Sequence, residues 1–226
     1  MQAALLKYQF ESLLGGHLDW QSRPAPERVR TGVPEVDRAT GGLPRGGLTE
    51  IFGPPSSGRT SLLVAILAEA AARDEFCALV DAEDAFDPGT ATAAGIRLDR
   101  LLWVRCGHSA EQALQAGDLL IQGGGFGLVA MDFGDTTAAR RISLTSWFRL
   151  RRAVENTPTV LVSVGLESNA KTCASLMLEC RRERIAWSGA RNTARLLRSM
   201  VVRIDSHRAR RAPRTVCTPV FTAKAI

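Results

Sequence analysis

An eight-residue stretch of this 226-residue chain has the residue types and spacing of a phosphate-binding loop. It reads Gly53-Pro-Pro-Ser-Ser-Gly-Arg-Thr60 and fits the pattern G-x-x-x-x-G-K-[ST] except at Arg59, where the pattern has lysine. Glycines let successive backbone N–H groups point at a phosphate, and the start of a following helix adds partial positive charge. The Thr60 hydroxyl would bind a magnesium ion that bridges the terminal phosphates. We therefore predict an ATP and Mg²⁺ site, and the residues expected to hold the nucleotide are Gly53, Pro54, Pro55, Ser56, Ser57, Gly58, Arg59, Thr60 and Ser61.

Arg59 decides what this loop is expected to do. Lysine carries a compact charge between the terminal phosphates, whereas arginine is longer and planar and reaches the phosphates differently. We expect ATP binding to be retained and hydrolysis to be weak or absent. The alternative is a glycine-rich turn between a strand and a helix that holds no ligand.

A second nucleotide signal is the run Leu128-Val-Ala-Met-Asp132, four apolar residues that end in an aspartate. At the carboxyl end of a buried strand, such a carboxylate can hold the magnesium shell through water. Many buried strands end in Asp, so the signal gains its meaning from lying downstream of the phosphate loop. We predict that Thr60 and Asp132 are the magnesium-binding residues.

These residues need a scaffold, and from Thr31 onward the sequence predicts an α/β fold. Short apolar runs alternate with helical stretches, as in a parallel sheet flanked by helices. The expected strands are residues 48–52, 77–81, 101–105, 128–132 and 159–164, and the expected helices are residues 61–73, 110–121 and 143–156. Past Gly165, residues 176–181, 200–205 and 215–222 look extended, and we expect antiparallel strands there that complete the sheet.

Residues 1–30 are expected to form an N-terminal helix and a Pro-rich linker, and residues 31–226 one core. The helix either packs on the core or docks a partner. Hydrophobic residues make up 45% and charged residues 23% of the chain, and no apolar run has the roughly 18 residues that cross a bilayer. Five irregularly spaced cysteines indicate neither a zinc site nor a disulfide framework. We therefore expect a cytoplasmic protein with no membrane contact.

Basic residues concentrate in the second part of the chain. Residues 1–100 carry 10 Lys/Arg and 14 Asp/Glu, whereas residues 101–226 carry 19 and 9. One cluster surrounds the helix expected at 143–156 and comprises Arg140, Arg141, Arg149, Arg151 and Arg152. Guanidinium groups neutralise phosphates whatever the base sequence, so this cluster predicts salt-sensitive contact with single-stranded DNA. A solvated face or a partner-docking surface explains it equally well. Trp147 and Phe148 beside it either stack bases or belong to the core.

Several motifs together resemble the bacterial RecA recombinases. The run Cys77-Ala-Leu-Val-Asp-Ala-Glu-Asp-Ala-Phe-Asp-Pro88 resembles the RecA segment that carries the catalytic glutamate. Similar likeness is seen in residues 31–37, 41–46, 50–58, 111–114 and 174–182, so the resemblance covers roughly residues 31–222. It implies a RecA-like ATP-binding core with a mainly parallel, twisted sheet.

The resemblance also implies roles for single residues. Glu83 stands at the position of the carboxylate that activates water, and Asp87 matches a residue that contacts the adenine. Thr90 replaces the aromatic residue that stacks on the base in RecA. Two lysines that reach the ATP of a neighbouring subunit fall on Ser206 and Arg208, so only Arg208 keeps a positive charge for a contact between subunits.

Other features depart from a full recombinase. Gly165 aligns with the glutamine that links ATP to DNA binding, the two DNA loops are short, and RecA's carboxy-terminal domain has no counterpart. Such a chain resembles the reduced RecA relatives called ImuA, which serve mutagenic translesion synthesis after DNA damage. That likeness implies an ATP-binding accessory protein of an SOS-type DNA repair response. It also implies a Y-family polymerase homologue or RecA as partner, and leaves self-association open.

Three functions remain open from the sequence. The first is the accessory role, in which the core serves as an interaction platform. The second is a DNA-dependent ATPase that forms filaments and exchanges strands. The third is a RecA-like regulator of cell division or of the SOS response that acts without DNA. Arg59 and the short DNA loops favour the first over the second.

Overall fold

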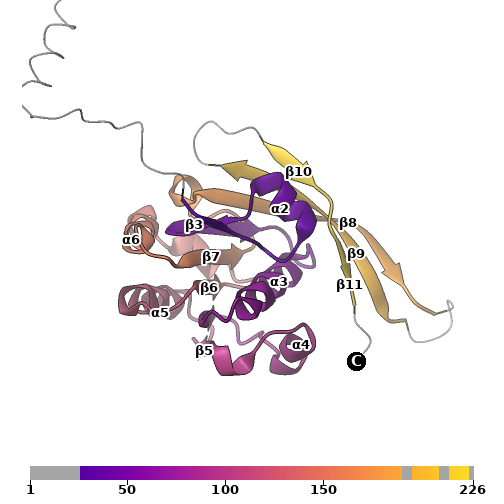
Figure 1. Ribbon diagram of the computed structural model, residues 1–226, viewed down its shortest axis with the longest axis horizontal. Coiled ribbons are helices and arrows are strands. Elements are labelled where there is room, and N and C mark those ends of the chain that lie inside the picture. Colours follow the sequence, from indigo (N-terminus) through magenta and orange to yellow (C-terminus); the bar gives the residue numbers. More distant parts are fainter. Residues whose placement is uncertain (1–25, 190–194, 209–213, 224–226) are drawn as a thin grey trace, which may run out of the picture.

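The computed structural model describes residues 26–189, 195–208 and 214–223, and the N-terminal helix expected within residues 1–20 lies outside them. In the described residues, a nine-stranded sheet has the order β10-β9-β8-β3-β7-β6-β4-β5, with β11 pairing to β9 (Figure 1). The expected α/β architecture is confirmed. No described helix combines the length and apolar character needed to cross a membrane.

The parallel part of the sheet follows the apolar runs of the sequence. Its strands are β3 (Gly47–Phe52), β4 (Cys77–Asp81), β5 (Leu101–Arg105), β6 (Leu128–Asp132), β7 (Val160–Gly165) and β8 (Leu176–Trp187). Four of these, β3, β4, β6 and β7, are buried on both faces, and β4, β6 and β7 accordingly read as nearly continuous apolar runs. The strand β8 differs from the expectation, because it is parallel to β3 over residues 176–179 and antiparallel only to β9.

Helices cover both faces of this sheet. They are α2 (Pro34–Thr40), α3 (Arg59–Ala72), α4 (Pro88–Ala93), α5 (Ala110–Gly123) and α6 (Leu144–Val154), and the short 3₁₀ turns are η1 (Leu98–Arg100), η2 (Thr137–Arg141) and η3 (Lys171–Cys173). The two short helices α2 and α4 span less than two turns and escape a search for apolar periodicity. Each begins with proline, whose fixed φ suits the first helical position.

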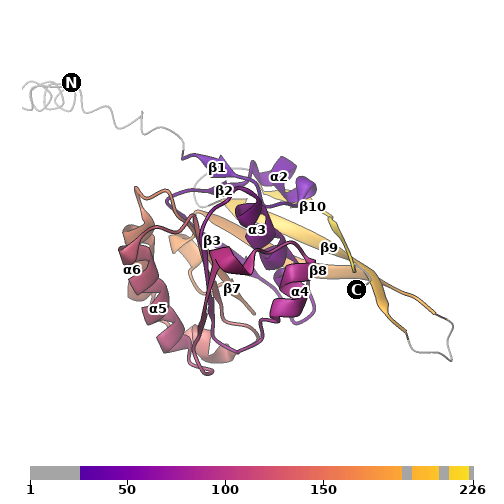
Figure 2. The same cartoon turned by 60° about the horizontal axis from the view of Figure 1, so that its bottom comes forward.

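Each face of the sheet has its own hydrophobic core. On one face, α3 buries Leu62, Leu63, Ile66 and Leu67 against the strands. On the other face, α5 and α6 cover the strands, and Figure 2 shows the two helices packed together there. Trp147 of α6 is fully buried and contacts Phe133 edge to face, whereas Phe148 is 48% exposed. Trp147 therefore belongs to the core, and only Phe148 remains available to a ligand.

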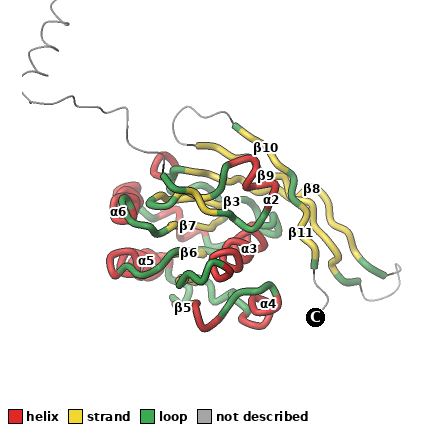
Figure 3. The backbone as a smooth tube through the Cα atoms, viewed as in Figure 1, coloured by secondary structure: helices red, strands yellow, loops and turns green. Residues whose placement is uncertain are grey.

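The last part of the chain forms a long antiparallel ribbon. It comprises the outer part of β8, β9 (Leu197–Arg208), β10 (Thr215–Cys217) and β11 (Val220–Thr222), and it extends beyond the helices (Figure 3). The sequence predicts one extended segment over residues 215–222, but the structure divides it at Pro219. Proline has no N–H to donate to a neighbouring strand, which explains the interruption.

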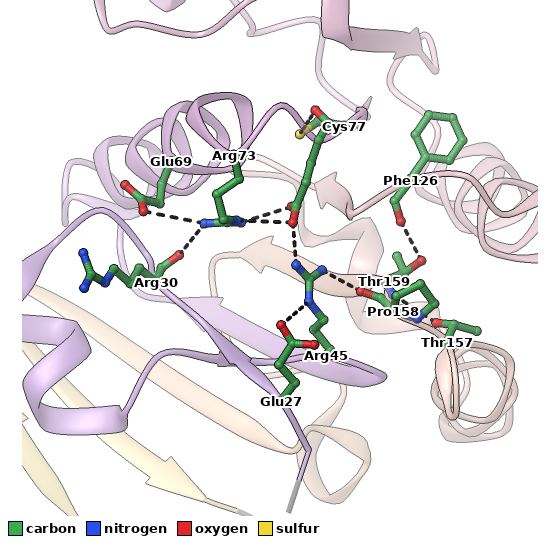
Figure 4. Close-up of polar contacts among 11 residues, drawn as sticks. Glu27, Arg30, Arg45, Glu69, Arg73, Cys77, Phe126, Thr157, Pro158 and Thr159 are labelled. Carbon is green, nitrogen blue, oxygen red and sulfur yellow. Dashed lines mark hydrogen bonds and ion pairs between the residues drawn. The ribbon is translucent and has the colours of Figure 1, made fainter.

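An ion-pair network closes the amino end of the parallel strands. Arg45 contacts Glu75 and donates to the carbonyl oxygen of Pro158 at 2.7 Å, while Arg73 donates to Glu75 at 3.1 Å (Figure 4). Burial alone would raise the pKa of Glu75, but hydrogen bonds from Arg73 and Arg45 outweigh it and lower that pKa. The cations at this end are thus satisfied within the protein.

Candidate nucleotide-binding site

The predicted phosphate loop connects β3 to α3 at the carboxyl end of the sheet, and two of its glycines have no room for a side chain. A Cβ on Gly53 would lie 2.1 Å from the carbonyl oxygen of Cys180 in β8. A Cβ on Gly58 would lie 2.6 Å from a methyl carbon of Val202 in β9, and Gly58 has φ 94°, which other residues rarely adopt. The ribbon therefore presses against the loop at both glycines.

The loop leaves polar groups available at the start of α3. Gly58 precedes the helix and provides no side-chain cap, and the amide of Leu62 bonds back to the Gly58 carbonyl at 3.0 Å. The amides before Leu62 at a helix start have no intrahelical acceptor. The Ser57 hydroxyl is buried and has no hydrogen-bond partner among the described residues. An anion at the helix N-terminus would satisfy these groups, which fits the predicted triphosphate.

Arg59 does not extend into the loop. Its side chain is buried, its Nη1 donates to the carbonyl oxygen of Gly134 at 3.1 Å, and its Nη2 contacts the carboxylate of Asp135. Both acceptors follow β6, so the guanidinium bridges α3 to the segment after the acidic strand. The donors of Arg59 are therefore taken by these two acceptors, although the side chain still lines the hollow beside the loop.

Two aspartates end neighbouring parallel strands beside the loop. Asp132 ends β6, accepts a hydrogen bond from the Gly134 amide at 2.8 Å, and is partly buried. Burial raises its pKa to about 6, although the Gly134 amide opposes that shift. Asp81 ends β4 and is paired with Asp132 in the sheet register. Both carboxylates lie where ligands of open α/β sheets bind.

Asp81 has a role that the sequence did not reveal. Its carboxylate accepts four hydrogen bonds. Three come from the backbone amides of Glu83 at 3.2 Å, Ala85 at 3.2 Å and Phe86 at 3.0 Å, and one comes from the indole N–H of Trp103 at 3.3 Å. These bonds fix the turn that carries Glu83. The available signal was an aspartate at the end of an apolar run, the same signal that identified Asp132.

Glu83, the predicted water-activating carboxylate, lies across the site from the loop. Its side chain packs against Gly134, where a Cβ would lie 2.6 Å from the Glu83 Cγ. Glu83, Asp132, Thr60 and Arg59 line one hollow of about 270 Å³ next to the loop. The structure thus brings the predicted carboxylates and the loop together, and Thr60 and Asp132 are suited to hold magnesium through its water shell. No group of three or more metal-ligating His, Cys, Asp or Glu side chains exists among the described residues.

Asp87 and Thr90, the positions that the resemblance relates to the base, lie at the start of α4, which borders a hollow together with α3. Asp87 caps α4 by accepting a hydrogen bond from the Thr90 amide at 2.8 Å. The Thr90 hydroxyl also contacts the Asp87 carboxylate and lowers the pKa of Asp87. Thr90 lines a mostly apolar hollow of about 430 Å³ together with Thr60, Val64 and Phe221. Asp87 therefore stabilises the helix that borders this hollow, and its predicted contact with the adenine stays a prediction.

The basic cluster is distributed over two elements. Arg140 and Arg141 lie in η2, and Arg149, Arg151 and Arg152 lie in α6. Arg140 forms an ion pair with Glu167, and Arg149 forms one with Asp118 at 3.3 Å. Arg151 and Phe148 line a hollow of about 890 Å³ that also includes Lys171. The cluster is thus partly committed to pairs within the protein.

The positions implied for contact between subunits lie at the end of β9. Ser206 is buried, and its hydroxyl donates to the carbonyl oxygen of Thr215 at 3.2 Å, so it is part of the sheet. Arg208 ends the strand opposite Leu176, and its side chain lies outside the described part of the chain. The predicted contact of Arg208 stays a prediction.

The fold and this site define an α/β nucleotide-binding core of the phosphate-loop type. The family described as the RecA N-terminal domain matches residues 16–140, which include the loop, Glu83 and Asp132. Because the match covers more than half of the chain, this chain belongs to that family.

Comparison with curated proteins gives the same result. The chain is similar to protein RecA of Rickettsia canadensis, with 43% identity over 108 residues, which are 47% of this chain and 31% of that protein. It is similar to protein RecA of Deinococcus radiodurans, with 44% identity over 106 residues, which are 46% of this chain and 29% of that protein. For protein RecA of Rhodospirillum rubrum the identity is 44% over 108 residues, which are 47% and 29%. The chain thus aligns to about a third of the length of these relatives.

Proposed function

We propose that this protein binds ATP with Mg²⁺ in the phosphate loop and hydrolyses it slowly or not at all. Support for binding comes from the free amides at the start of α3, the buried Ser57 hydroxyl and the adjoining carboxylates. The triphosphate would lie on the loop, and the hollow beside Thr90 is wide enough for the base. When bound, magnesium would neutralise charge on the terminal phosphates, and Glu83 would orient a water molecule.

The proposal that hydrolysis is weak rests on the position of Arg59. Its guanidinium lines the hollow beside the loop, but Gly134 and Asp135 take its donors, so we expect it to stabilise the phosphoryl group poorly during transfer. The pairing also fixes the segment that follows Asp132. Arg59 therefore acts in this proposal as a structural clamp between α3 and β6.

We further propose that the protein serves as an accessory factor in DNA repair, of the kind that supports translesion synthesis. The connection from β7 to β8 is short, and buried Glu50 holds it by accepting hydrogen bonds from the Ser168 hydroxyl at 2.6 Å, the Asn169 amide at 2.6 Å and the Ala170 amide at 2.7 Å. A segment fixed in this way has little freedom to wrap a DNA strand. An interaction platform needs no such movement. The proposed partners are a Y-family polymerase homologue or RecA.

A DNA-dependent ATPase with recombinase activity is the second candidate. Two observations favour it: Glu83 lies beside the loop as a catalytic carboxylate would, and exposed Phe148 lies with Arg151 on one hollow. Stacking and charge neutralisation are the usual means of holding single-stranded DNA. A regulatory role without DNA, in cell division or the SOS response, would leave both features unused.

Turnover measurements separate these functions. We expect purified protein to show a Mg²⁺-ATP-dependent increase in melting temperature but negligible phosphate release, with and without single-stranded DNA. Robust DNA-stimulated turnover that disappears in Glu83→Gln would instead establish the ATPase. If Arg59→Lys gains turnover, Arg59 is the block. The absence of any shift with ATP would show that the loop is only structural.

The accessory role has its own test. Purified protein would be mixed with a purified Y-family polymerase homologue or RecA from the same organism, and the complex measured by size-exclusion chromatography and calorimetry. We expect a stoichiometric complex with at least one of them. Failure to bind either would remove the accessory proposal while leaving nucleotide binding untouched.

A further inference from the structure

The ribbon of β8 and β9 lies directly against the phosphate loop, and this contact places an arginine beside it. Gly53 packs on the Cys180 carbonyl, and Gly58 packs on Val202 and on Met200, whose methyl carbon would lie 3.4 Å from a Cβ at Gly58. The face of the ribbon that carries Val202 is therefore the face that looks at the loop. Any side chain on that face near Val202 is within reach of a ligand in the loop.

Arg182 is on that face. It is the direct partner of Val202 in the antiparallel register, and directly paired residues project to the same side of a sheet. A register shift follows immediately, because Arg184 pairs with Val201 and Glu183 is the extra residue of a bulge. Adjacent residues of β9 project to opposite sides, so Arg184 projects away from the loop. The bulge thus turns two nearby arginines to opposite faces.

Arg182 borders the loop on two sides. One hollow, of about 350 Å³, lies between residues 56–61 and the ribbon residues Arg182, Trp187 and Met200. Another, of about 480 Å³, lies between Pro54 and Pro55 of the loop and Arg182 with its neighbours. The two hollows share Arg182.

The guanidinium of Arg182 also has no ion pair among the described residues. Its neighbour Arg181 is paired with Glu179, and Arg203 is paired with Asp205, so these two carboxylates are engaged elsewhere. Arg182 is exposed. It is a cation beside the loop, whereas the loop's own Arg59 is held by Asp135.

We propose that Arg182 binds the phosphates of the nucleotide from β8 of the same chain and supplies donors that Arg59, held by Gly134 and Asp135, does not have available. This rests on the proposed binding of ATP to the loop. A planar guanidinium with five donors suits bidentate contact with phosphate oxygens. Nucleotide binding then depends on the ribbon as well as on the loop, and a ligand that moves the ribbon changes the affinity for ATP.

The test compares Arg182 with Arg184, which project from opposite faces of the ribbon. Calorimetric titration with Mg²⁺-ATP would be made on the wild-type chain, Arg182→Gln, Arg182→Lys and Arg184→Gln. Loss of a charge-assisted contact is expected to weaken ATP binding about tenfold in Arg182→Gln. Arg182→Lys should recover part of the loss, and Arg184→Gln, with the same change of net charge, should stay within about twofold of wild type.

Each outcome is decisive. Equal losses in Arg182→Gln and Arg184→Gln would mean that only the overall charge matters, and would overturn the proposal. Wild-type affinity in Arg182→Gln would do the same and leave the nucleotide site standing. A wild-type chain that does not bind Mg²⁺-ATP would overturn the nucleotide site itself, and the role of Arg182 with it. Thermal unfolding of each variant checks that the ribbon is intact.

Discussion

The two ends of the parallel strands are built on opposite principles. At the amino end, Arg45 and Arg73 are held by Glu75, and every cation of the network has a partner within the protein. At the carboxyl end, the amides at the start of α3 and the Ser57 hydroxyl lack protein partners in the described part of the chain, and partly buried Asp132 has a raised pKa. The first end is suited to stability and the second to a ligand, because an anion at the helix start would satisfy the groups that the protein leaves open there.

The largest expected effect is at the loop glycine that touches the ribbon. Gly53→Ala places a methyl group against the Cys180 carbonyl, and we expect a loss of about 3 kcal/mol in unfolding free energy together with loss of ATP binding. Urea denaturation and calorimetry measure the two. Gly123→Ala is the matched control, since no atom lies within 4 Å of a Cβ there. An unchanged denaturation midpoint in Gly53→Ala would mean that the ribbon does not press on the loop.

The next effect concerns the carboxyl end of the strands, where removal of a charge should increase stability rather than decrease it. Without nucleotide, Asp132→Asn should raise the unfolding free energy at pH 7 by about 2 kcal/mol, because burial disfavours the charged carboxylate. The folded pKa, about 6, is above the ordinary value of 3.8, so the contribution of Asp132 to stability is full below pH 3.8 and is lost as the pH rises through 6. The two proteins should therefore be equally stable near pH 3.5. Denaturation curves across this range test it, and a destabilised variant at pH 7 would contradict it.

At the amino end of the strands, removal of a charge should instead decrease stability. The pKa of Glu75 is lowered from 4.5, so its stabilising contribution is present above pH 4.5 and is lost as the pH falls. Glu75→Gln should lower the unfolding free energy at pH 7 by about 1.5 kcal/mol and leave the affinity for ATP unchanged. Glu69→Gln is the control, because Glu69 is 3.7 Å from Arg73 and should cost less. A fall in ATP affinity in Glu75→Gln would show that the two ends are coupled.

The smallest effect concerns the clamp between α3 and β6. Arg59→Lys loses the planar contact with Gly134 and Asp135, and we expect a cost of about 1 kcal/mol in stability. If Asp135 is the partner that matters, Arg59→Lys and Asp135→Asn combined should cost less than the sum of the single changes. Strictly additive costs in a double-mutant cycle would place the Arg59 contribution elsewhere.

Local sequence patterns were sufficient to predict the elements that form an apolar run or repeat an apolar period. The apolar runs at β4, β5 and β6 predicted those strands with the bounds the structure has, because strands of this length are marked by their own apolar residues, whether buried as in β4 and β6 or at the edge of the sheet as in β5. The short helices α2 and α4 were not predicted, since they have too few turns to show a period. Pairing of β8 in parallel with β3 was also missed, because strand neighbours are set by the path of the whole chain.

The candidate site divides in the same manner. Sequence spacing located the loop, Thr60 and Asp132, and resemblance located Glu83, and the structure brings all of them to one edge of the sheet. No pattern could show that Arg59 turns away toward Asp135, a residue 76 positions later. Nor could it show that Asp81 fixes the turn carrying Glu83, or that Arg182 stands over the loop 123 positions after Arg59.

By itself, the sequence determined the α/β class, the phosphate loop and membership of the RecA N-terminal domain family, because these depend on residue types at short spacings. Only the tertiary structure decided which cations remain available. A charged side chain is drawn to opposite charge nearby, and the partners of Arg45 and Arg59 come from distant parts of the chain, whereas Arg182 has no ion pair among the described residues. The same residue type therefore closes one end of the sheet, clamps a helix and lines the hollows beside the phosphate loop.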